Sequence, residues 1–245
     1  MHSKLNENIE FIYNNLTNHV IFQSAYSRSQ CFEMLGVIST DKYSIIYNGV
    51  DKSIFQPATN PVGKKTRLMS TGNFRNLDML EPLVLSLDSL VKDYDFELIL
   101  IGPVINDELK PLLNRKYISY QGLQEREQLA KSLQQADIFL YSHLNPPCPN
   151  SVLEAISTGL PIVGFDSGSM RELCFFNTEL LVPVSDRVFQ QYDEFNADLL
   201  ANVISNCIDN YSYYKEQALK NSNLFDFQDC GQAYVNVFKN QISRD

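Results

Sequence analysis

Short apolar runs alternate with helical patterns along most of the chain. Eight runs have the length and composition of strands: HVIF, YSIIY, RLMST, FELILIG, YISY, DIFLY, PIVGF and ELLVP. Helical patterns lie between them at about 4–16, 26–35, 77–92, 124–134 and 150–158, and a helical tail runs from about 196 to 242. Such alternation is typical of βαβ units, whose parallel strands are covered on both faces. The pattern therefore predicts an α/β fold with a doubly wound, mostly parallel sheet.

The same pattern divides the chain into four parts. Residues 1–50 contain two strand patterns, too few for a separate sheet, and look like the end of something larger. Residues 51–66 gather Gly, Pro, Asn and Lys, as linkers do. Residues 67–195 hold six strand patterns, enough for a complete domain, and residues 196–245 follow as helices.

Composition narrows the class of protein. A chain of 245 residues with 44% hydrophobic residues can bury a large α/β core. The net charge of −9 argues against a nucleic-acid partner. Five scattered cysteines without a C-x-x-C pair predict neither a disulfide framework nor a metal site. Because no signal-peptide core or long apolar segment is present, we expect a cytoplasmic protein. A location at the cytoplasmic face of a membrane is compatible with this expectation.

The segment PPCPNSVLEAISTGLP, residues 146–161, predicts a short helix with a free amino end. Asn150 and Ser151 are good N-caps, and Gly159 before a proline ends the helix. Unpaired N–H groups and the helix dipole attract phosphate to such an end. The carboxylate of Glu154 repels phosphate but accepts hydrogen bonds from sugar hydroxyls. The segment therefore predicts a nucleotide or nucleotide-sugar site, with an ordinary capped helix and a solvent-facing glutamate as the alternative.

Glycines and polar residues follow the predicted strands, where open α/β sheets bind ligands. Glycine permits a positive φ and a close approach of ligand to backbone. A guanidinium at position 75 could clamp a diphosphate, although an exposed charge would fit there too. Each glycine alone is also compatible with an ordinary turn, and His143 is compatible with an ordinary loop histidine. The hypothesis of a ligand site therefore depends on the joint alignment of the glycines with the predicted helix at 150–158. The predicted ligand-facing residues at these strand ends are Gly72, Asn73, Arg75, Gly102, Gly122 and Ser142.

From about residue 19 to 175 the sequence resembles the group-1 nucleotide-sugar glycosyltransferases of the GT-B fold. VIFQSAYSRS resembles the last strand and helix of their amino-terminal domain, and YNGVD followed by FQP resembles their interdomain linker. RLMSTGNFR resembles the strand and phosphate loop that open their donor domain. The most specific part is CPNSVLEAISTGLPIVGFDSGSMREL, residues 148–173.

This resemblance implies two Rossmann-like domains, of which the carboxyl-terminal one grips the nucleoside diphosphate and the donor sugar. The implied contacts are ribose hydroxyls for Glu154, a phosphate for the amides of Asn150, Ser151 and Val152, the diphosphate for Arg75, and the base for the loops at Gly102 and Gly122. A glycan or lipid-linked acceptor, as in polysaccharide biosynthesis, is implied as the other substrate. No metal or other cofactor is expected.

The sequence departs from the family pattern in three ways. The first of two glutamates that the family spaces eight positions apart is replaced by Pro146, which cannot contact a sugar through hydrogen bonds. The basic residues of the phosphate loop are reduced to Asn73 and Arg75, which weakens support for a leaving group. About 18 residues precede residue 19, where a whole further domain is expected.

Three interpretations of that last departure stay open. The chain is a fragment, or its acceptor half is another polypeptide or a second copy, or it is a non-catalytic binding or assembly module. A nucleotide-sugar epimerase on the same fold would need more acid and base residues than three histidines suggest. A dinucleotide dehydrogenase fits worst, because no strand ends in G-x-G-x-x-G.

Overall fold

A six-stranded sheet, all of whose paired strands are parallel, forms the centre of the protein. The computed structural model describes residues 4–35, 42–58, 63, 65–184 and 195–242. The strand order is β5-β4-β3-β6-β7-β8. The strands are β3 (Thr66–Thr71), β4 (Phe96–Ile101), β5 (Ile118–Gly122), β6 (Ile138–Tyr141), β7 (Ile162–Asp166) and β8 (Leu181–Pro183). The predicted doubly wound α/β fold is confirmed, and we call residues 65–184 and 195–225 the main domain.

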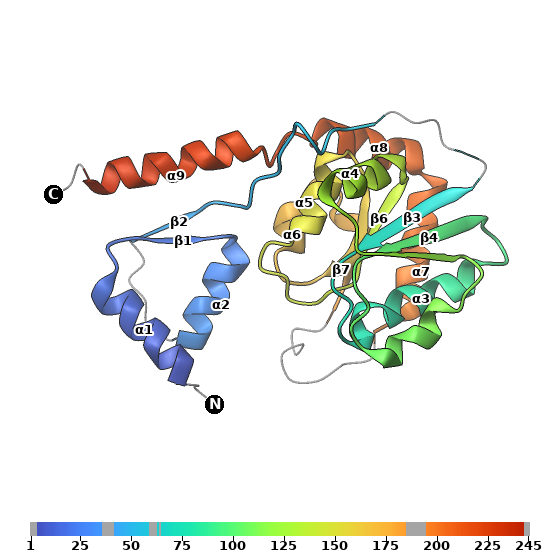
Figure 1. Cartoon of the computed structure of the whole chain (residues 1–245), viewed down its shortest axis with the longest axis horizontal. Coiled ribbons are helices and arrows are strands. Elements are labelled where there is room, and N and C mark those ends of the chain that lie inside the picture. Colours follow the sequence, from blue (N-terminus) through green and yellow to red (C-terminus); the bar gives the residue numbers. More distant parts are fainter. Residues whose placement is uncertain (1–3, 36–41, 59–62, 64, 185–194, 243–245) are drawn as a thin grey trace.

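Helices cover both faces of this sheet (Figure 1). They are α3 (Glu81–Leu90), α4 (Arg126–Gln135), α5 (Asn150–Ser157), α6 (Met170–Leu173), α7 (Ala197–Asp209) and α8 (Tyr211–Lys220). Short 3-10 helices, η1 (Leu77–Met79), η2 (Asp107–Leu113) and η3 (Thr178–Leu180), lie in the connections. The pattern predicted all of these except η2, α6 and η3, which are too short or irregular to show a helical period.

Alternation along each strand builds two separate apolar cores. Met69 of β3 and Phe139 of β6 face α4 and α5 in one cluster of buried side chains. Their neighbours Leu68 and Ile138 face α3 and α7 in the other cluster. Because successive strand residues point to opposite faces, a run of consecutive apolar residues covers both. This explains why the strands of the main domain read as continuous apolar runs.

Residues 4–35 and 42–50, which we call the N-terminal unit, form a smaller βαβ arrangement. It consists of α1 (Lys4–Leu16), β1 (Val20–Phe22), α2 (Ala25–Leu35) and β2 (Tyr43–Ile45). In the described residues β1 and β2 pair in parallel only with each other, so the expectation that residues 1–50 hold too few strands for a sheet of their own was wrong. Phe22, Phe32 and Tyr43 pack edge to face between them, and the Arg28 guanidinium lies over the last two rings. This aromatic cluster stabilises two strands that would otherwise be marginal.

Helix α9 (Phe227–Ile242) leaves the main domain and runs toward the N-terminal unit (Figure 1). Val50 donates its N–H to the carbonyl of Phe225 at 2.8 Å and accepts from the N–H of Phe227 at 3.0 Å. The predicted linker, residues 51–66, therefore begins against the start of α9, while its residues 59–62 and 64 lie outside the described residues. No helix in the described part of the chain is long and apolar enough to span a membrane.

Candidate functional site

The strand order of the main domain creates a switch point between β3 and β6. From β3 the chain proceeds outward through β4 to β5, and then it returns to β6 on the other side of β3. Doubly wound sheets bind ligands in the crevice at this point, outside the carboxyl ends of the strands. Gly72 directly follows β3 and Ser142 directly follows β6, so two predicted site residues lie at the switch point.

The three predicted glycines lie at neighbouring strand ends. Gly102 has a φ of 123°, and a Cβ added there would lie 2.0 Å from the carbonyl oxygen of Gly72. Its N–H donates to the carbonyl of Gly122 at 2.7 Å, and Gly122 has a φ of 67°. Only glycine permits this combination of backbone conformation and close approach. The structure therefore brings the three together in one strip of backbone, whereas their contacts with a ligand stay a prediction.

The loop after β3 alternates between buried and exposed side chains. Phe74 is fully buried, and its backbone pairs with Val104 beyond β4. Asn73 and Arg75 on either side of it are exposed. Within the described residues no carboxylate pairs with the Arg75 guanidinium, which leaves this cation available beside the strip of glycines.

Two residues follow β6 and have different surroundings. The hydroxyl of Ser142 is buried and donates to the carbonyl of Met79 at 2.6 Å, so it already holds the segment after β3 in place. The ring of His143 packs beside that of Tyr141 and against Gly72. Burial lowers the pKa of His143 to about 4, and its buried Nε2 has no partner in the described part of the chain. His143 is therefore a neutral side chain at physiological pH.

Helix α5 begins at Asn150, whereas it would begin at residue 151 if Asn150 were its N-cap. Pro149 is the N-cap residue, with φ −74° and ψ 115°, and no side chain caps the helix. The predicted capping by Asn150 or Ser151 was wrong, because the Asn150 amide oxygen instead accepts from Asn48 at 2.8 Å. The N–H of Val152 donates to the carbonyl of Pro149 at 3.1 Å, whereas those of Asn150 and Ser151 have no acceptor among the described residues. These two N–H groups are the ones open to an anion.

Glu154 lies in the second turn of α5 and is half-buried. Its carboxylate has no hydrogen-bond donor in the described structure, and burial raises its pKa to about 7, with the Arg126 guanidinium of α4 acting in the opposite direction. A desolvated carboxylate without donors costs free energy. Hydroxyl groups of a ligand would supply the missing donors.

The connection from β6 to α5, which we call the α5 loop (residues 142–149), is fastened to the turn after β7. Asn145 is the one non-glycine residue in the described chain with a positive φ, 55°. Its N–H donates to Ser167 Oγ at 2.8 Å, and the N–H of Ser169 donates to the carbonyl of Pro146 at 2.9 Å. Pro146 is buried here, so it is part of the loop's scaffold. Asn145 was not predicted from the sequence, although asparagine tolerates this conformation better than most residues.

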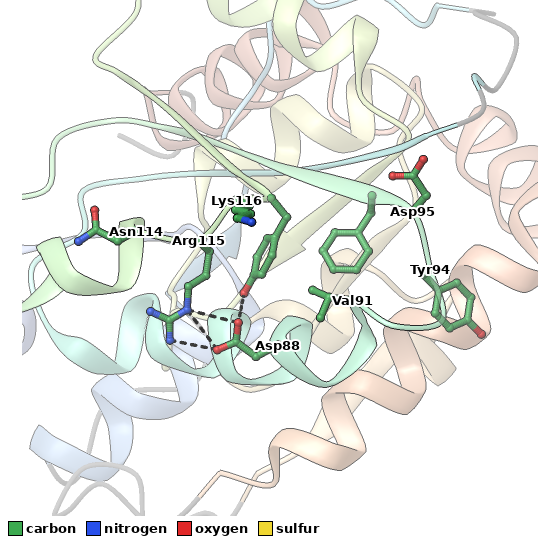
Figure 2. A pocket seen from close by; sticks show the side chains of 9 residues that line it. Asp88, Val91, Tyr94, Asp95, Asn114, Arg115 and Lys116 are labelled. Atoms are coloured by element: carbon green, nitrogen blue, oxygen red, sulfur yellow. Dashed lines mark hydrogen bonds and ion pairs between the residues drawn. The ribbon is translucent and has the colours of Figure 1, made fainter.

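A cavity of about 410 Å³ lies at the opposite edge of the sheet, at the amino ends of β4 and β5 (Figure 2). Asp88 of α3 accepts from the Arg115 guanidinium at 3.0 Å and from the Tyr117 hydroxyl at 2.8 Å. These charges therefore satisfy one another. None of the predicted site residues lines this cavity.

Comparisons with known proteins identify the family and the fold of the chain. The family model "Glycosyl transferases group 1" matches residues 65–201. A sucrose-phosphate synthase from Thermosynechococcus elongatus superposes with a TM-score of 0.76 at 16% identity, covering 98% of this chain and 62% of its own. HepE from Anabaena, solved with UDP and glucose, has a TM-score of 0.76 at 16% identity, covering 96% and 66%. A glycosyltransferase from Rickettsia africae has a TM-score of 0.75 at 15% identity, covering 97% and 68%.

These structures share the fold of this chain, which spans roughly two thirds of the length of each. No curated protein sequence matches it. The family model covers more than half of the chain, including the whole six-stranded sheet. The chain belongs to the group 1 glycosyltransferases.

Proposed function

We propose that the main domain binds a nucleoside-diphosphate sugar and supports transfer of its glycosyl group, with retention, to a glycan or lipid-linked acceptor. The open amides of Asn150 and Ser151 would hold a phosphate, and the exposed guanidinium of Arg75 would lie beside the diphosphate. The glycine strip at the switch point would let the base approach the backbone. No metal or other cofactor takes part in this proposal.

The observation that carries the proposal is the Glu154 carboxylate, which is half-buried, has no donor in the described structure and lies one helical turn beyond these open amides. Ribose presents two neighbouring hydroxyl donors at the distance from a phosphate that a nucleotide fixes. The structure of HepE with UDP-glucose shows that a protein of this fold takes such a donor. Binding would therefore complete the hydrogen bonding of Glu154.

A binding screen tests the proposal. UDP, GDP, ADP, CDP and their sugars are titrated against the wild type, Glu154→Ala and the control Glu179→Ala, which removes an exposed glutamate in η3. We expect one nucleotide to bind the wild type and the control with equal affinity. Its affinity for Glu154→Ala should be lower by about 10-fold or more, as for loss of hydrogen bonds to a charged group. Equal affinity for Glu154→Ala would remove the ribose role, and no binding of any nucleotide would remove the proposal.

We also propose that a partner α/β unit, in a separate polypeptide, completes the acceptor side. Among the described residues β1 and β2 have no strand on their outer edges, and parallel sheets are normally covered and extended. Helix α9 has no buried residue and exposes Phe227, Val235, Phe238 and Ile242. One fold neighbour, with a TM-score of 0.73, is described as a GtfA/B complex. A homodimer is the competing arrangement.

A non-catalytic binding or assembly role is the second candidate, because buried Pro146 stands where the family has a carboxylate. A release assay separates the two. A catalytic chain with its partner releases free nucleoside diphosphate from the bound nucleotide sugar when acceptor is added, whereas an assembly module binds the nucleotide and releases none.

We propose a cytoplasmic location, including the cytoplasmic face of a membrane where a lipid-linked acceptor would lie. The five cysteines are all free thiols, and Cys148, Cys174 and Cys207 are buried. Free buried thiols suit a reducing compartment.

A further inference from the structure

The α5 loop is held from outside the main domain as well as from within it. The hydroxyl of Tyr26, in the first turn of α2, donates to the Asn145 amide oxygen at 3.0 Å. The amide of Asn48 donates to the carbonyl of Cys148 at 3.2 Å and to Asn150 at 2.8 Å. The N-terminal unit therefore contacts the loop near its middle and at the point where α5 begins.

Glu172 of α6 fixes the position of Tyr26. Its two carboxylate oxygens accept from the N–H groups of Ala25 and Tyr26, each at 2.9 Å, and one of them also accepts from the Tyr47 hydroxyl at 2.9 Å. The first amides of a helix have no partner within that helix, and a carboxylate there also interacts favourably with the helix dipole. A carboxylate of the main domain thus holds the amino end of α2, although 146 positions separate Glu172 from Tyr26.

We propose that Glu172 and Tyr26 are positioning residues that couple docking of the N-terminal unit to the conformation of the α5 loop. Asn145 occupies a backbone conformation that non-glycine residues seldom adopt, and such conformations persist only where the surroundings hold them. Ser167 holds the backbone of Asn145, and Tyr26 holds its side chain. When α2 is docked on Glu172, the loop presents the open amides of α5; without this docking, the loop loses its external contacts.

The first test measures the loop itself and needs no ligand. Hydrogen exchange of the backbone amides in residues 142–153 is compared in the wild type, Tyr26→Phe and Glu172→Gln. The matched controls are Tyr213→Phe, an exposed tyrosine of α8, and Glu179→Gln. We expect exchange in the loop to be about five-fold or more faster in the two variants, as for loss of one hydrogen bond, while the amides of β3 stay protected.

The second test measures the consequence for binding and rests on the proposed function. We expect the affinity for the nucleotide found in the screen to fall about three-fold to ten-fold in Tyr26→Phe and Glu172→Gln, and to stay at the wild-type value in both controls. Neither residue is placed in contact with the nucleotide, so a merely local structural role would leave the affinity unchanged.

The two tests fail separately. A wild type that binds no nucleotide removes the proposed function, while the exchange experiment still decides the coupling. Loop exchange at the control rate in Tyr26→Phe overturns the coupling even if the nucleotide binds. If Glu172→Gln also exposes the amides of β3, that variant has lost its fold and Tyr26→Phe alone decides.

Discussion

Glu154 combines two properties that oppose one another in the folded protein. Its carboxylate is partly removed from water, and the described residues give it no hydrogen-bond donor. A group that weakens the folded protein in this way is typical of a site whose partner comes from outside. The residue is thus better suited to binding a ligand than to stabilising the fold. Its effect on the free energy of unfolding can be measured from the pH dependence of stability.

The stability of the protein should depend on the ionisation of Glu154. Its pKa rises from an ordinary 4.5 to about 7 on folding because of burial. The resulting stabilisation is fully present below pH 4.5 and is lost as the pH rises through 7. We therefore expect Glu154→Gln to unfold with a free energy about 1–3 kcal/mol higher than the wild type at pH 8, and with little difference at pH 4.5, in urea titrations. A gain of equal size at both pH values would contradict this mechanism, and Glu179→Gln is the control.

Gly102 and Gly122 offer a matched pair at the site. Both have a positive φ, but a Cβ at Gly102 would meet the Gly72 carbonyl, whereas one at Gly122 would meet no atom within 4 Å. We expect Gly122→Ala to lower the free energy of unfolding by about 1–2 kcal/mol through its backbone conformation. Gly102→Ala should lower it by about 3 kcal/mol or more, because β3 and β4 must also separate. Equal losses in urea unfolding would show that the close approach to Gly72 has no energetic weight.

Side-chain contacts hold α3 against the amino ends of β4 and β5, at the end of the sheet opposite the site. Asp88 of α3 pairs with Arg115 (Figure 2) and accepts from the Tyr117 hydroxyl before β5. The rings of Tyr117 and Phe96 pack edge to face. Burial is the main reason why the pKa of Tyr117 is raised, followed by its hydrogen bond to Asp88. These contacts attach α3 to the start of β5.

Tyr117→Phe tests whether this attachment is independent of the site. The change removes one hydrogen bond to a carboxylate and keeps the ring, so the free energy of unfolding should fall by about 1–2 kcal/mol. Nucleotide affinity should stay unchanged, because the strand ends that carry the site lie at the other edge. Tyr213→Phe is the control for stability, and a parallel loss of affinity would show that the two edges are coupled.

The local sequence pattern was sufficient to predict most helices and strands. It was insufficient to predict the residues that hold the α5 loop in place. Buried strands such as β4, FELILI, are recognisable from their own residues. The Asn150 side chain is engaged by Asn48, which lies 102 positions away, so local propensity at Asn150 gave the wrong role. Glu172 and Tyr26 were missed for the same reason, since an exposed-looking glutamate in a short helix shows its partners only in three dimensions. The alignment of the three glycines was predictable because parallel strands end at one edge.

Several large apolar side chains outside the main domain are exposed to solvent. Phe11, Ile12 and Leu16 of α1 and Phe238 and Ile242 of α9 are each at least 48% exposed, and all lie outside the main domain. Where such side chains form an apolar patch, the patch often marks a protein interface. Helices α1 and α9 are therefore candidate contact surfaces for the partner unit proposed above.

Without that partner the chain should self-associate through α9. We expect light scattering to show a concentration-dependent rise in mass for the wild type at tens of micromolar, reduced in Phe238→Asp. Phe175→Asp is the matched control, because both phenylalanines are 57% exposed and Phe175 belongs to the main domain. A wild type that stays monomeric at every concentration, or equal effects of both variants, would count against an interface on α9.

The contact between Val50 and residues 225–227 also governs the order in which the protein can fold during synthesis. Val50, Phe55 and Phe225 share one buried cluster, and the Lys52 ammonium donates to Ser222. The segment that joins the two parts can therefore reach its final position only when residues near 227 have left the ribosome. Contacts so distant in sequence form late. Until then the N-terminal unit, which is synthesised before the main domain, exposes its apolar side chains to chaperones and to neighbouring chains.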